Sequence, residues 1–144
     1  MVYKPFTRKV FYYETDKMAV VHHSNYLSYL EEARIDFLEQ SGYPYDKMEE
    51  NGVLIPVMTA SCRYKRALRY GDEMMIKMRI EEFNGFKFTV SYQIINTATN
   101  EVNATAETSH FFVDEEFKPI RTKSVHPEIY RIFSEIIQKD IYSE

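Results

Sequence analysis

The chain has 144 residues, 44% of them hydrophobic and 28% charged, and its formal net charge at pH 7 is −4. This size and composition predict one folded domain, residues 1–144, and exclude an intrinsically disordered chain. The lack of a cationic excess argues against nucleic acid as a partner.

The first part of the chain predicts a strand followed by a long helix. Residues 5–13 are rich in Thr, Val, Phe and Tyr, which favour strands. Apolar residues then recur three or four positions apart, at Tyr26, Leu30, Ala33 and Phe37. Ser24 stands where a helix N-cap is expected, and Gly42 follows as a C-terminal stop. A short second helix is expected over residues 45–51.

The second part of the chain predicts four strands and a last helix. Apolar and polar residues alternate over 58–65, 74–81 and 88–94, and a last strand is expected over 102–113. In the first of these, Met58, Ala60, Cys62 and Tyr64 form the side expected to be buried. Asn84-Gly85 is a strong hairpin signal. Isoleucines and a phenylalanine at helical spacing predict an amphipathic C-terminal helix over 129–137.

This order of elements predicts an α+β fold. Four long strands in a meander form a twisted antiparallel sheet that, with the first strand, wraps around one central helix. One helix leaves part of the sheet and its edges uncovered. We therefore expect the chain to pair with a second copy, as a homodimer or homotetramer.

Location is suggested by what the sequence lacks. Cys62 is the single cysteine, which excludes a disulfide within one chain and fits a reducing compartment. The first five residues lack the apolar core of a signal peptide, and no apolar run could form a transmembrane segment. We expect a cytoplasmic protein.

The loop before the helix carries the residues that suggest chemistry. Asp16 lies a few residues before the helix start, where free backbone N–H groups favour negative charge. An acid beside such a site is what acyl transfer to water requires. The alternative is a turn residue that hydrogen-bonds its own backbone. A metal is not expected, because the adjacent His22 and His23 would seldom face one ion and no ligand partner stands at suitable spacing.

These residues resemble a known family, the hotdog-fold acyl-CoA thioesterases. The resemblance rests on Thr15-Asp16, Val20-Val21, His23-Ser24-Asn25-Tyr26, Glu31-x-Ala33-Arg34, Tyr70-Gly71-Asp72-Glu73 and Asn84-Gly85. It is strongest for the 4-hydroxybenzoyl-CoA thioesterase branch, including the Tol-Pal-associated bacterial type. It implies a hotdog fold and hydrolysis of an acyl-CoA by Asp16, as general base or nucleophile. The backbone N–H of His23 would polarise the carbonyl. No cofactor is implied, since CoA is part of the substrate.

Other residues are candidates for binding the substrate. Tyr26, Glu31 and Thr59 are candidates for substrate contacts, although Glu31 is more simply a surface partner of Arg34. Basic residues that suit the phosphates of CoA are Arg63, Lys65 and Lys87. For Arg63 and Lys65 the alternative is a solvated sheet edge.

The chain also departs from the family pattern. Met18 and Ala19 stand where glycines are common, which keeps a non-catalytic acyl-binding protein as an alternative. Asn84-Gly85-Phe86 replaces the basic residues with which some members grip the nucleotide. An acyl-carrier-protein thioesterase is therefore a second alternative.

Overall fold

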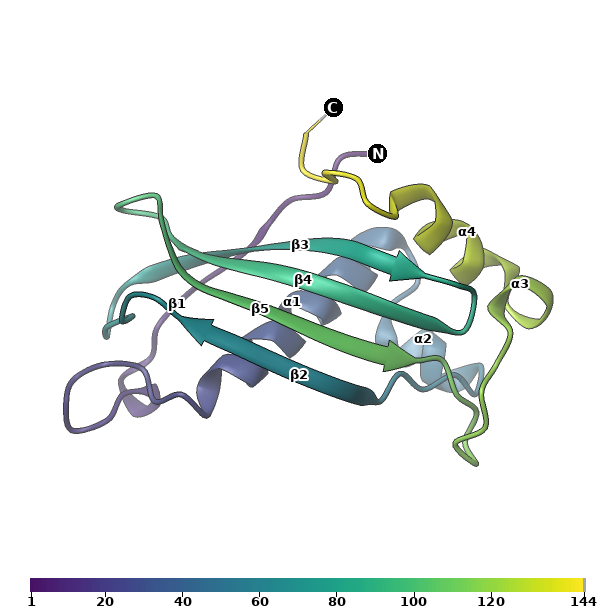
Figure 1. Cartoon of the computed structure of the whole chain (residues 1–144), viewed down its shortest axis with the longest axis horizontal. Coiled ribbons are helices and arrows are strands. Elements are labelled where there is room, and N and C mark those ends of the chain that lie inside the picture. Colours follow the sequence, from purple (N-terminus) through teal and green to yellow (C-terminus); the bar gives the residue numbers. More distant parts are fainter. Residues whose placement is uncertain (144) are drawn as a thin grey trace.

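The computed structural model describes residues 1–143 and contains an antiparallel sheet of five strands that wraps around one long helix. The strands are β1 (Phe6–Lys9), β2 (Val57–Tyr64), β3 (Glu73–Phe83), β4 (Lys87–Asn96) and β5 (Glu101–Phe111). Their spatial order is β1-β3-β4-β5-β2. Helix α1 (Asn25–Ser41) runs along one face of the sheet, as Figure 1 shows. The predicted α+β arrangement is confirmed.

The core lies between the sheet and α1, where the alternating buried side chains of the strands pack against the apolar stripe of the helix. Along β3 and β4 every second side chain is buried, namely Met74, Ile76, Met78, Ile80, Phe88, Val90, Tyr92 and Ile94. They face the stripe of α1 that carries Tyr29, Leu30 and Phe37. Each large apolar side chain buried in this way contributes about 1.5–3 kcal/mol. The helix ends as predicted, at Gly42 with a φ of 87°.

The smaller helices close the ends of the sheet. They are η1 (Tyr12–Glu14), α2 (Tyr45–Glu50), α3 (Thr122–Val125) and α4 (Pro127–Ile136). Phe133 of α4 packs against Phe37, Phe83 and Phe88 at the end of the sheet where the β3–β4 hairpin turns, which we call the hairpin end. The predicted short helix and C-terminal helix are therefore confirmed, whereas α3 was not expected. No helix within residues 1–143 is long and apolar enough to span a membrane.

The first strand is shorter than the predicted 5–13. It ends at Lys9, and the chain turns into η1 because the Glu14 carboxylate accepts a hydrogen bond from the Phe11 backbone N–H at 2.8 Å. This contact replaces the ladder hydrogen bonds that would extend β1. Strand propensity alone does not indicate that the buried Glu14 carboxylate accepts a backbone hydrogen bond at this point and so ends the strand.

The prediction of one buried side for β2 is wrong for the single chain. Ala60, Cys62 and Tyr64 do face the helix side, and Tyr64 packs edge-to-face on Tyr26 with ring centroids 4.8 Å apart. Nevertheless Ala60 and Tyr64 are exposed and Cys62 is only partly buried. The reason is that β2 is an edge strand, and α1 packs over β1 and β3 instead.

A chain of buried polar groups crosses the core. Arg34 Nη1 donates to the Tyr92 hydroxyl at 3.0 Å, that hydroxyl lies 2.5 Å from Thr108 Oγ1, and Thr108 Oγ1 lies 2.8 Å from His110 Nε2. Arg34 is 6% exposed, so the expected surface pair with Glu31 is wrong. Residues 1–143 offer no partner to Arg34 Nε. Within the described residues this cation is thus hydrogen-bonded to one neutral hydroxyl, that of Tyr92, and to no carboxylate.

This network predicts a specific loss of stability in acid. Burial, together with the nearby charge of Arg34, lowers the pKa of His110 from 6.5 to about 4. Between these values the unfolded chain binds a proton that the folded chain does not, so stability falls as pH falls. Relative to His110→Gln, the wild type should lose about 3 kcal/mol between pH 7 and 4. Urea unfolding across this range tests it, and parallel curves for the two proteins would contradict it.

Candidate active site

The loop that carries Asp16 is a small hairpin fixed to the rest of the fold. Thr15 and Val21 form an antiparallel bridge, and the Asp16 N–H donates to the Val20 carbonyl at 2.9 Å. Val21 N–H donates to the Leu68 carbonyl at 2.8 Å, just beyond the end of β2. In Figure 1 this loop lies beside the start of α1, at the end of the sheet opposite α3 and α4.

Asp16 is partly exposed and keeps one oxygen free. Its Oδ1 accepts a hydrogen bond from the Met18 backbone N–H at 2.8 Å, which is the turn contact expected of a loop aspartate. Oδ2 has no hydrogen-bond partner in the described part of the chain, residues 1–143. One oxygen therefore shapes the loop while the other is available to a water or a substrate.

Ala19 occupies a backbone conformation that favours glycine, with a φ of 63°. Glycine would adopt this conformation without the strain that a Cβ atom causes. We expect Ala19→Gly to raise the free energy of unfolding by up to ~1 kcal/mol and to keep turnover within twofold. Ala98, which has no positive φ, provides the control: Ala98→Gly should destabilise in a urea titration. Equal destabilisation by both changes would contradict the strain at Ala19.

The helix start differs from the prediction in its cap. Ser24 has helical dihedral angles, and its hydroxyl caps no helix N–H but lies 2.8 Å from His22 Nδ1. Ser24 therefore occupies the predicted N-cap position but makes no capping hydrogen bond, and a turn closed by the Asn25 N–H and the His22 carbonyl precedes the helix. Within residues 1–143 the His23 backbone N–H donates no hydrogen bond. It is thus available at the positive end of the α1 dipole.

The rings of the two histidines lie against each other, with centroids 4.2 Å apart and planes tilted by 31°. Both are exposed, and His110 lies deep in the core. Across residues 1–143 no group of three or more His, Cys, Asp or Glu side chains is arranged to hold a metal ion.

The residues expected to contact the substrate are placed differently from one another. Tyr26, 3% exposed, packs below the helix start, and burial raises the pKa of its hydroxyl to about 12. Glu31 is exposed on α1, one turn further along than Leu27. Thr59 lies on the face of β2 away from the helix, and its Oγ1 is 2.5 Å from Ser109 Oγ. Only Tyr26 lies at the Asp16 end of the molecule.

The basic residues are also divided between two places. Arg63 lies near the end of β2, and Lys65 directly follows that strand, where its backbone N–H donates to the Asn103 carbonyl. Arg63 and Lys65 therefore both lie near the Asp16 loop. Lys87 begins β4 at the hairpin end of the sheet. Lys87 can therefore approach an Asp16 loop only if that loop belongs to a second copy.

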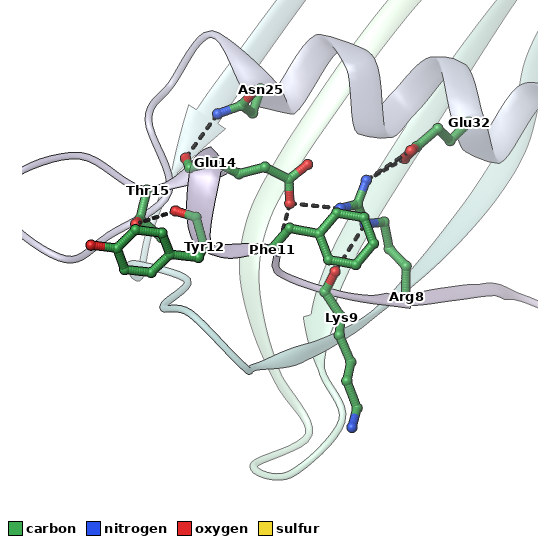
Figure 2. Close-up of polar contacts among 8 residues, drawn as sticks. All are labelled: Arg8, Lys9, Phe11, Tyr12, Glu14, Thr15, Asn25 and Glu32. Atoms are coloured by element: carbon green, nitrogen blue, oxygen red, sulfur yellow. Dashed lines mark hydrogen bonds and ion pairs between the residues drawn. The ribbon is translucent and has the colours of Figure 1, made fainter.

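Sequence reasoning missed a polar cluster beneath the loop, drawn in Figure 2. Arg8 from β1 joins Glu14 from η1 and Glu32 from α1. A polar residue at each position was visible, but nothing local in the sequence pairs residues 24 positions apart. The nearest signal was the Tyr-Glu-Thr-Asp sequence, in which Glu14 immediately precedes Thr15-Asp16.

Comparison with known proteins gives consistent matches. A family model described as the thioesterase-like superfamily matches residues 10–133. A Bacillus subtilis protein, provisionally named an acyl-CoA thioesterase, is 40% identical over 121 residues, 83% of this chain and 87% of the relative. A DHNA-CoA thioesterase structure from Staphylococcus aureus superposes with a TM-score of 0.87 at 30% identity, covering 94% of this chain and 91% of that one. An acyl-acyl carrier protein thioesterase of Arabidopsis thaliana is 26% identical over 116 residues, 81% of this chain and 61% of the relative.

Proposed function

Because the chain belongs to the thioesterase-like superfamily, we propose that it hydrolyses acyl-CoA thioesters with Asp16 as the reacting acid. The observation that carries this proposal is the position of Asp16. Its loop is tied to the start of α1, where the His23 N–H is free. The motif that includes Asp16 further supports the 4-hydroxybenzoyl-CoA thioesterase branch of the family, in its Tol-Pal-associated form.

The proposed chemistry uses one carboxylate and one backbone donor. Asp16 removes a proton from water as the water attacks the thioester carbon, or attacks that carbon itself to form a mixed anhydride. Charge develops on the carbonyl oxygen, which the His23 N–H and the helix dipole stabilise. In the general-base route the C–S bond then breaks, the CoA thiolate leaves with the proton that Asp16 took from water, and the free acid remains. In the nucleophilic route the C–S bond breaks to leave the mixed anhydride, and a water then hydrolyses the anhydride, which restores the Asp16 carboxylate, releases the free acid and supplies the proton that the thiolate takes up. A donor of this kind contributes roughly 3 kcal/mol to lowering the barrier.

We propose that the working form is a homodimer or homotetramer. The unpaired edge of β2 and its exposed apolar side chains, including Val57, Met58 and Tyr64, suit pairing with another copy. If two β2 strands pair antiparallel, Lys87 of a second copy comes to the end where Arg63 and Lys65 lie. The three cations can then serve one CoA. The free thiol of Cys62 supports a cytoplasmic location.

The second candidate is hydrolysis of an acyl-carrier-protein thioester. The observation in its favour is that Arg63 and Lys65 are exposed near the Asp16 loop, where an acidic partner can contact their charges. The Arabidopsis relative named for this activity adds support.

Release of free thiol, followed with Ellman's reagent, tests these proposals. We expect turnover with at least one member of a panel of aromatic and aliphatic acyl-CoAs. Release only from acyl-carrier protein would replace the first proposal by the second. No release from either substrate would leave a non-catalytic acyl-binding protein.

A further inference from the structure

We infer that Glu14 is a positioning residue that holds the Asp16 loop and the start of α1 in fixed relation. This inference rests on the proposed function, since it concerns the two groups to which that function assigns the chemistry. Glu14 itself touches neither Asp16 nor the His23 N–H. It acts through four hydrogen bonds, two to its carboxylate and two to its backbone carbonyl.

The carboxylate of Glu14 fixes the near side of the loop. Its Oε1 accepts hydrogen bonds from Arg8 Nη2 at 2.6 Å and from the Phe11 backbone N–H at 2.8 Å (Figure 2). The residue is 6% exposed, so water does not compete for these contacts. Asp16 follows two residues later, and its backbone path begins from this anchored point.

The backbone carbonyl of Glu14 fixes the far side. It accepts hydrogen bonds from the His22 N–H at 2.9 Å and from Asn25 Nδ2 at 2.8 Å. His22 precedes the residue with the free N–H, and Asn25 is the first residue of α1. One residue therefore joins the segment entering the Asp16 loop to the segment leaving it.

Arg8 makes this anchor rigid. Its guanidinium carbon lies 4.5 Å from the Phe11 ring centroid and 4.6 Å from that of Tyr29. Its Nη1 is 2.7 Å from both carboxylate oxygens of Glu32, as Figure 2 shows. Arg8 is thus stacked on two rings and paired with two acids. The chain of contacts links β1, η1 and α1 directly below the loop.

A buried ion pair of this kind is weak evidence for stability, since apolar residues often serve as well. What it supplies is fixed geometry. A misplacement of about 1 Å in a reacting group can cost a hundredfold in rate. Loss of the clamp should therefore lower kcat, while KM, set by binding elsewhere, changes little.

Steady-state kinetics and hydrogen exchange on Glu14→Ala, which removes both contacts of the carboxylate, test the inference. We expect kcat to fall ten- to a hundredfold with KM within twofold, and amides of residues 16–23 to exchange faster while those of β3 and β4 do not. The matched control is Glu81→Ala, which breaks the Arg79–Glu81 pair at the other end of the sheet. It should leave kcat and the loop amides unchanged.

Asn25→Ala provides a second route, because it removes only the side-chain contact to the Glu14 carbonyl. It should lower kcat in the same way, and the double variant should lose less than the product of the single losses. Unchanged kcat in both single variants, or faster exchange spread evenly over the sheet, would overturn the inference. If the wild type hydrolyses no thioester, the proposed function fails, and the exchange data alone decide whether Glu14 holds the loop.

Discussion

Replacement of Asp16 by asparagine is expected to lower kcat by about a thousandfold and leave the fold intact. Asparagine has the same shape, and its side-chain oxygen can still accept the Met18 N–H that shapes the loop. What it lacks is the ability to take a proton from water or to attack a thioester. Thiol release together with circular dichroism and thermal unfolding would separate lost chemistry from lost structure.

A matched variant is available at Asp114. Its Oδ1 also accepts backbone hydrogen bonds within a turn, from Glu116 and Lys118 at 2.9 Å each. Asp114→Asn should therefore keep normal turnover. Near-normal hydrolysis by a well-folded Asp16→Asn protein would refute the assignment of Asp16 as the reacting acid.

The same site allows the two chemical routes to be separated. In a single turnover in ¹⁸O-water, the general-base route places the label only in the released acid. The nucleophilic route, when water attacks the Asp16 carbonyl of the anhydride, places label in the protein. Mass spectrometry of the peptide that contains Asp16 distinguishes these outcomes.

Elements whose signals are local could be predicted from the sequence. The alternation along β3 and β4 and the 3.6-residue spacing of α1 depend only on which face is buried, so both were found with nearly correct ends. Arg34 shows how far this reasoning reaches. It lies four residues after Leu30 and four before Leu38, both buried, so the apolar stripe itself indicated an inward arginine. The pairing of charged side chains three residues apart on a helix surface does not apply to Glu31 and Arg34, because Arg34 is buried.

The candidate site was predictable only in part for the same reason. Asp16 and the helix start are close in sequence, and the motif that carries them is local. The Arg8 anchor, the Val20 pairing with Arg69 and the division of Lys87 from Arg63 depend on which strands become neighbours. The predicted burial of one side of β2 would require a surface that one chain does not supply.

The second large expected effect is the loss of assembly when Ala60 on the edge strand β2 is replaced by arginine. The side chain is exposed on the helix side of the edge strand β2, so an arginine there should cost the single chain little. In an assembly formed through β2 the same arginine would be buried without a partner. An uncompensated buried charge costs about 3 kcal/mol, roughly a hundredfold in the dimer dissociation constant. Ala60→Arg should therefore shift the protein toward monomers.

Light scattering combined with the thiol-release assay measures this effect. If a second copy completes the site, as the position of Lys87 suggests, the monomeric variant should have a raised KM for acyl-CoA and reduced turnover. Ala98→Arg makes the same substitution in the exposed β4–β5 turn and should change neither quantity. A monomeric Ala60→Arg protein with wild-type KM and kcat would mean that one chain carries a complete site. An unchanged assembly would mean that copies meet through another surface.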